Sequence, residues 1–187
     1  MTANKWTNRI QWPRDNFILR VIEEKFAPSA SSGNPMITLV AETVAMLLND
    51  GSLVEDVDIG GEQYMIVGAK VTNYHPTIVL NDDNSVNEEK TAKAQERVKE
   101  LYGKFKLPND NINFENPELG FKGKCFSALL YGKEQAQRRS PTKEQLAKGI
   151  REGEVIIDPV TRQPVVNYWP TIDRIYGLAD VGDKRPY

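Results

Sequence analysis

The sequence has almost no cysteine or histidine: one residue of each occurs among its 187 residues. Cys125 alone cannot form an intramolecular disulfide or a zinc site built from several cysteines. His75 alone excludes a metal centre that needs two or three histidines, and it is the one residue on which a catalytic triad could be centred. The pattern favours structural roles for both, Cys125 as a small core residue and His75 as a surface or hydrogen-bonded side chain. The lack of disulfides favours a reducing, cytoplasmic compartment.

Long apolar runs and common enzyme motifs are also missing. The longest apolar run covers only residues 44–48, whereas a membrane span needs roughly 18 residues. The first residues lack the apolar core of a secretory signal. Neither a phosphate-binding Gly-x-x-x-x-Gly-Lys-Ser/Thr run nor a Gly-x-Ser-x-Gly elbow occurs. We therefore expect no membrane partner and no cofactor, and we expect a binding protein rather than an enzyme.

The net charge of −2 is small, but the charges are segregated along the chain. Residues 41–62 contain six acidic residues and no Lys or Arg, whereas residues 120–151 contain eight basic and two acidic residues. Such segregation is typical of a protein with one face for an anionic partner. Pairing of the two segments with each other across the fold would explain it equally well.

Alternating and β-branched residues predict strands in the first half of the chain. Residues 16–26 place Phe17, Leu19 and Val21 on one face of a strand. A second strand over residues 36–44 follows a loop rich in serine, glycine and proline, and the two strands are predicted to form a hairpin. Further strand-like segments lie between residues 54 and 74.

The pattern changes to a helix over residues 87–102, which begins with a capped acidic turn and has apolar residues at helical spacing. Strand patterns return at residues 121–131, and a basic loop over 135–153 contains a short predicted helix at 142–148. Residues 155–159 and 164–169 are predicted to form another hairpin. These elements together predict a mainly β fold, a small antiparallel barrel with one inserted helix.

Aromatic residues beside cations are the main functional signal. Single-stranded nucleic acid is held by basic grooves with aromatic faces on which bases stack. The spacing Lys122-x-Lys124-x-Phe126 would place two cations and an aromatic ring on one strand face, although Phe126 is also a candidate core residue. Tyr131 continues this face, and further aromatic–basic groups lie near residues 6–14 and 168–174.

Residues 25–26 and 32–37, Lys-Phe followed by Ser-Gly-Asn-Pro-Met-Ile, resemble a stretch of small bacteriophage single-stranded DNA-binding proteins. In that group the stretch links the first two strands of an OB-fold barrel. The order of a helix, a Leu-Pro element at 107–108 and a Gly-Lys-x-Phe strand start at 123–126 is similar too. The sequence departs from the group in two places: residues 182–187 are not acidic like the tail of many members, and residues 135–153 have no clear counterpart.

The resemblance implies an OB-fold-like domain at residues 16–180, with an N-terminal arm at 1–15 and a flexible tail at 181–187. It implies a protein that binds and protects single-stranded DNA during phage DNA replication or recombination, without strong sequence specificity, in the cytoplasm of an infected bacterium. Replication or recombination proteins are further expected partners. The predicted DNA-binding residues are Trp12, Arg14, Lys25, Tyr74, Lys122, Lys124, Tyr131, Arg138 and Arg139.

Two other functions stay open at this level. A small metal-dependent nuclease could use Asp56, Asp58 and Glu62 to hold cations, with Lys70 nearby. Solvated carboxylates in polar turns are the commoner explanation of such acidic pairs. A virion or assembly protein that uses its β-rich surface for contacts is the third possibility.

Overall fold

A computed structural model describes residues 3–181, so residues 182–187 of the predicted tail lie outside the described part of the chain. The elements follow the chain in this order: β1 (Asn4–Lys5), β2 (Asp15–Pro28), β3 (Pro35–Leu47), β4 (Leu53–Val54), β5 (Asp56–Ile59), β6 (Glu62–Met65), β7 (Lys70–Pro76), α1 (Glu88–Lys104), β8 (Cys125–Ala136), α2 (Lys143–Ala147) and β9 (Val166–Leu178).

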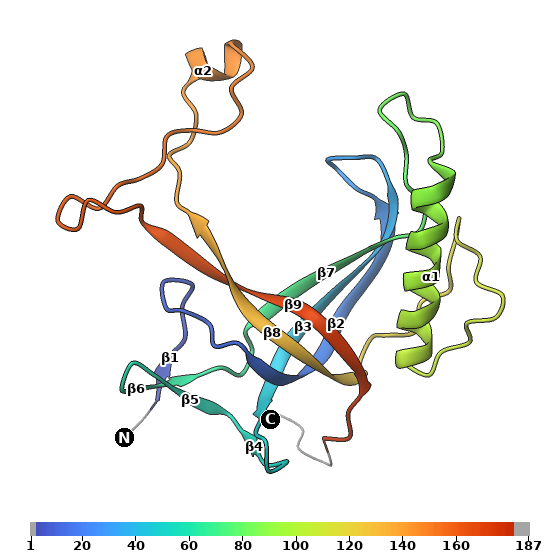
Figure 1. The fold of residues 1–187 in the computed structure, drawn as a ribbon, viewed down its shortest axis with the longest axis horizontal. Coiled ribbons are helices and arrows are strands. Elements are labelled where there is room, and N and C mark those ends of the chain that lie inside the picture. Colours follow the sequence, from blue (N-terminus) through green and yellow to red (C-terminus); the bar gives the residue numbers. More distant parts are fainter. Residues whose placement is uncertain (1–2, 182–187) are drawn as a thin grey trace.

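The long strands form one antiparallel sheet in the order β7–β3–β2–β8–β9, and β4 pairs with the end of β3. The first long strand thus lies between the second and the fourth, and α1 is inserted between the third and the fourth. This is the Greek-key order of the OB fold, a five-stranded and partly open barrel. The predicted fold class is confirmed: the protein is mainly β, with an OB-fold-like antiparallel barrel and one inserted helix (Figure 1).

Alternation along the strands places the core on one face of the sheet. Phe17, Leu19 and Val21 of β2 are all buried, as the sequence pattern predicts. On β3 the odd-numbered residues from Ile37 to Ala45 are buried, while the even-numbered ones lie on the other face and are half-buried. Successive strand side chains point to opposite faces, so β3 contributes one row of side chains to the core and one to the surface, whereas in β2 Ile18 is buried as well, beside an irregularity in the strand pairing.

Helix α1 agrees with the predicted helix at residues 87–102 and extends two residues further. The Asn87 side chain caps it by accepting a hydrogen bond from the Lys90 amide at 3.0 Å, which satisfies one of the free amides of the first turn. The predicted helix at residues 142–148 is also present, as α2, and begins with a capping box at Thr142. No helix within residues 3–181 has the length and apolar character needed to cross a membrane.

The N-terminal segment is mostly irregular, but it folds back on the barrel. Strand β1 pairs with β6 in parallel. Trp12 is 1% exposed, and its ring centroid lies 4.9 Å from that of Trp6 and 5.1 Å from that of Phe17. Gly132 of β8 makes room for it, because a Cβ there would lie 3.1 Å from Trp12 atoms. The prediction that Trp12 stacks on DNA is therefore corrected: its ring lies in the core.

Strand β8 begins later than the sequence pattern suggests. Residues 121–124 form a turn, with Gly123 at a φ of 81°, and the strand begins at Cys125. Lys122 and Lys124 consequently do not share a strand face with Phe126, which is buried. The prediction of a cation–cation–aromatic row along this strand is wrong, because the glycine turns the backbone before the strand begins.

Candidate nucleic-acid interface

Three strands place a cation, a hydroxyl and an aromatic ring in one row on the surface of the barrel. Lys25 of β2 pairs with Thr38 of β3, and Thr38 pairs with Tyr74 of β7. Side chains of directly paired residues share a face of the sheet. Tyr74 is 60% exposed, so its ring is accessible to a ligand. We refer to Lys25, Thr38 and Tyr74 as the Tyr74 row.

The Tyr74 row lies between two open cavities. One, of about 650 Å³, is lined by the row and by the β2–β3 loop at residues 29–34. The other, of about 340 Å³, is lined by Lys25, Thr38, Lys122 and the acidic pair Glu23 and Glu24. Because Lys25 and Thr38 line both cavities, the two cavities adjoin at these residues, and we refer to them together as the depression.

The β2–β3 loop is held in place by its own hydrogen bonds. The Ser29 amide donates to the Asn34 carbonyl at 2.9 Å, and the Gly33 amide donates to the Ser29 carbonyl at 2.9 Å. Gly33 has a φ of 70°, which favours glycine. The Asn34 side chain accepts a hydrogen bond from the Leu80 amide at 2.9 Å. The loop thus presents its serine hydroxyls at the edge of the depression in a defined position.

A carboxylate on β2 positions Lys122 beside the depression. One Glu24 oxygen accepts hydrogen bonds from the amides of Phe121, at 2.7 Å, and Lys122, at 3.1 Å. The Lys122 side chain has no hydrogen bond or ion pair within residues 3–181. Glu24 also affects the core: burial first, then the charges of Glu24 and Glu118, raise the pKa of Tyr102 to about 12.

A second aromatic–basic cluster is formed by β8 and β9 together with Arg14, which precedes β2. The Arg14 guanidinium lies 5.9 Å from the Tyr131 ring centroid, and its Nη2 atom is 2.7 Å from an Asp173 oxygen. Lys133 pairs with the exposed Trp169 across the same two strands. Arg14 is thus partly neutralised by Asp173. Neither Arg14 nor Tyr131 lines the depression beside the Tyr74 row.

Arg138 and Arg139 lie in a long excursion between β8 and β9, residues 137–165, which we call the arm. The Arg138 guanidinium donates to the Gly153 carbonyl at 3.1 Å and lies 3.5 Å from a Glu152 oxygen, so it joins the two sides of the arm. The Arg139 side chain is exposed and has no partner within residues 3–181. Lys124 is half-buried, and its backbone carbonyl accepts a hydrogen bond from the Val21 amide at 3.0 Å.

The nine predicted DNA-binding residues therefore lie in several separate parts of the structure. Lys25, Tyr74 and Lys122 surround one depression. Arg14 and Tyr131 form the second cluster, and the two arginines at 138–139 lie in the arm. Trp12 is buried, and Lys124 supports the turn before β8.

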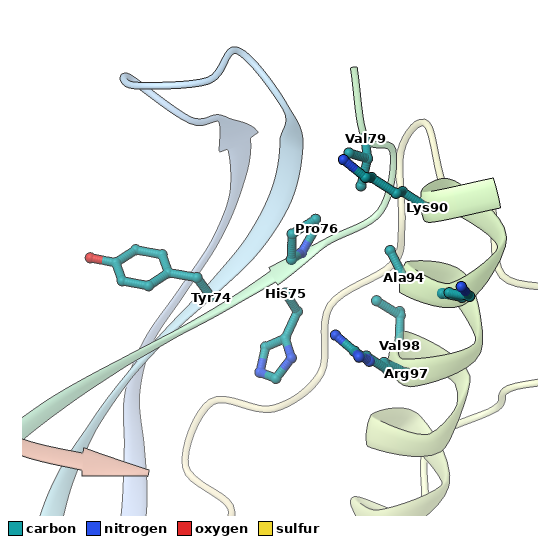
Figure 2. A pocket seen from close by; sticks show the side chains of 9 residues that line it. Tyr74, His75, Pro76, Val79, Lys90, Ala94, Arg97 and Val98 are labelled. Atoms are coloured by element: carbon teal, nitrogen blue, oxygen red, sulfur yellow. The ribbon is translucent and has the colours of Figure 1, made fainter. Parts of the chain in front are cut away.

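His75 leaves β7 on the side opposite to Tyr74 and points towards α1 (Figure 2). It lines a cavity of about 320 Å³ together with Lys90, Lys93 and Arg97. Its Nε2 atom is buried and has no hydrogen-bond partner among the described residues, so the expected hydrogen bond is absent at this atom, while the residue as a whole is half-buried. Burial lowers the pKa of His75 to about 4, and the ring is consequently neutral at pH 7.

The structure also shows the surroundings of Asp58, from the acidic set of the possible nuclease site, and of Cys125. The Asp58 carboxylate accepts hydrogen bonds from the Gly61 amide at 3.0 Å and from the Gln63 side chain at 3.4 Å, within a β-turn region. No group of three or more His, Cys, Asp or Glu residues within 3–181 is arranged to hold a metal ion. Cys125 is a free, half-buried thiol.

Sequence reasoning missed Thr38 and the loop serines. Thr38 follows the buried Ile37, so strand alternation places it on the outer face. Alternation predicts on which face of the sheet Thr38 lies, but not which residues flank it. The flanking residues depend on the register of β2, β3 and β7. Comparisons with family models, with curated proteins and with solved structures found no match to this chain.

Proposed function

We propose that the protein binds single-stranded DNA, without strong sequence preference, across the β2–β3–β7 face of its barrel. The observation that carries this proposal is the Tyr74 row, an exposed aromatic ring aligned with a lysine and a hydroxyl. OB folds bind oligonucleotides on the face of their second and third strands and with the loops beside it. In this chain those strands are β3 and β7, and the loops are the β2–β3 loop and the arm.

Each part of this face has a physical role in the proposed complex. A base stacks on the Tyr74 ring, an interaction worth roughly 1–3 kcal/mol and tolerant of sequence, because every base has a π-face. Lys25 and Lys122 neutralise backbone phosphates, and the release of counterions supports affinity. Arg139 supplies a further cation for a backbone phosphate, in the arm. The small net charge of the whole chain is compatible with DNA binding, since only the surface along which the DNA strand lies has to be positive.

The protein would act by coating and protecting DNA strands during phage DNA replication or recombination, in the bacterial cytoplasm. This role rests on the resemblance of residues 25–37 to bacteriophage single-strand binders and on the OB-fold-like barrel. Proteins of replication or recombination are the corresponding partners.

Titration of a fluorescent oligo-dT and of a duplex of equal length, at several salt concentrations, tests the proposal. The single strand should bind more tightly, because only unstacked bases offer their faces. Its affinity should fall with salt with a log–log slope of several units, since several phosphates are contacted. Equal affinity for the duplex, or a flat salt response, would contradict the proposal.

A further inference from the structure

The acidic and basic segments of the sequence lie at different ends of the molecule. The acidic segment, residues 41–62, runs from the second half of β3 through β4 and β5 at one end, and the basic segment, residues 120–151, includes β8 and reaches the arm with α2 at the other end (Figure 1). The four ion pairs within residues 3–181 are Arg14–Asp173, Lys93–Glu89, Lys104–Glu100 and Arg138–Glu152. None of them joins the two segments. The possibility that they neutralise each other within one copy is therefore not realised in the described structure.

The β5–β6 hairpin presents an exposed face that is acidic around an apolar side chain. Asp56 pairs with Met65, and Asp58 pairs with Gln63, so all four side chains lie on one face. Val57 points the other way and is buried. Met65 is 43% exposed beside β5, which carries the exposed carboxylates of Asp56 and Asp58. We call Asp56, Asp58, Gln63 and Met65 the hairpin face.

The hairpin face keeps its negative character despite one neighbouring lysine. Lys5 of β1 pairs with Met65 and adds a single positive charge at the edge. Glu55, which precedes β5, is exposed and adds further negative charge beside this face, whereas Glu62 lies on the other face of β6, where it accepts a hydrogen bond from the Tyr64 hydroxyl. A partner that fits this surface carries an exposed apolar group surrounded by several cations.

The tip of the arm, residues 143–151, has that complementary character. Leu146 and Ile150 are 54% and 44% exposed. The Ile150 amide donates to the Gln145 carbonyl at 2.9 Å, which fixes Ile150 beside α2. Lys143, Lys148 and Arg151 are exposed around this pair, and their side chains have no partner within residues 3–181.

We infer that the arm tip of one copy docks on the hairpin face of a second copy of this chain. Leu146 and Ile150 pack against Met65, and the cations of the tip lie against Asp56 and Asp58. The contact joins two different surfaces of the protein, so it is heterologous and lets copies add head to tail rather than closing a two-fold dimer. It does not use the Tyr74 row, which stays open in every copy.

The association is weak for free protein and sensitive to salt, because exposed ion pairs contribute little individually and are screened. A shared DNA strand raises the effective concentration of neighbouring copies. Cooperative coating of long single strands follows, and this consequence alone rests on the proposed function. The docking itself can be measured without DNA.

Charge reversal at each surface, followed by mixing, tests the inference by sedimentation velocity in low salt. The tip variant is Lys143→Glu with Lys148→Glu, and the face variant is Asp56→Lys with Asp58→Lys. The wild-type protein should sediment faster as its concentration rises, and each variant alone should stay monomeric. An equimolar mixture of the two variants should associate again, because the unchanged tip of the face variant meets the unchanged face of the tip variant, and the two reversed surfaces also complement each other. Recovery in the mixture also shows that both variants are folded.

The matched control is Lys90→Glu with Lys99→Glu on α1, which reverses two exposed charges away from both surfaces and should associate like the wild type. A wild-type protein that stays monomeric at every concentration overturns the inference. So does a mixture that fails to associate, or a tip or face variant that associates like the wild type. Binding of the wild-type protein to an oligo-dT too short for two copies is measured separately. If the protein does not bind this oligonucleotide, the proposed function is contradicted, whereas the inferred docking between copies is not.

Discussion

Removal of the Tyr74 ring is the sharpest single perturbation of the proposed interface. Tyr74 is 60% exposed, and its hydroxyl makes no hydrogen bond within residues 3–181. Its loss should therefore change the free energy of unfolding by no more than about 0.5 kcal/mol, as is usual for surface positions. The Tyr74→Ala variant should fold normally and differ from the wild type only in what it binds.

The expected loss of binding follows from the stacking of one base. Stacking on an aromatic side chain contributes roughly 1–3 kcal/mol, which corresponds to an increase of about 5- to 150-fold in the Kd for oligo-dT. The slope of affinity against salt should stay unchanged, because the tyrosine side chain neutralises no phosphate. Tyr74→Phe should keep most of the affinity, since the ring remains.

Fluorescence anisotropy with a labelled oligo-dT measures these differences, and urea unfolding measures stability in parallel. Tyr176→Ala is the matched control, because Tyr176 is 48% exposed on β9 and lines neither cavity of the depression. It should bind like the wild type. Unchanged affinity of Tyr74→Ala, or an equal loss in Tyr176→Ala, would refute the reasoning.

Three further predictions concern His75, Trp12 and the two arginines of the arm. Between about pH 6.5 and pH 4 the unfolded chain protonates His75 while the folded protein keeps it neutral. The free energy of unfolding should therefore fall with pH across this window, by up to about 3 kcal/mol more than in His75→Asn; equal pH profiles in urea unfolding would contradict the low pKa. Trp12→Ala should lower the free energy of unfolding by about 3–5 kcal/mol in the same assay, as truncation of a buried aromatic does. A folded variant with normal stability and weak DNA binding would show instead that Trp12 contacts DNA. Arg139→Ala should reduce the salt slope of binding by about one and leave the arm resistant to protease, whereas Arg138→Ala should also make the arm easier to cleave; identical behaviour of the two would refute their different roles.

The barrel was predictable because its signals are local. Alternation in β2 identifies Phe17, Leu19 and Val21 as core residues, and Asn87 marks the start of α1 through an ordinary cap. Each of these features depends on residues a few positions apart. The same local signals led to the correct position of α2.

The site was only partly predictable, because it depends on contacts between distant segments. Trp12 lies in a polar stretch of sequence, and only its packing against Phe17 and over Gly132 makes it a core residue. Lys25 and Tyr74 were both predicted, but their alignment through Thr38 depends on strand register. That register follows from pairing between β2, β3 and β7, which the sequence pattern does not specify.

Photocrosslinking is the most direct test of where the strand lies. Oligo-dT with iodouracil substituted at single positions is irradiated with the wild-type protein, and the crosslinked peptides are mapped by mass spectrometry. The account predicts that the main crosslink falls on Tyr74 and is lost from this position in Tyr74→Ala. A main crosslink on Tyr131 or Trp169, with none on Tyr74, would place the strand on β8 and β9 and contradict the account.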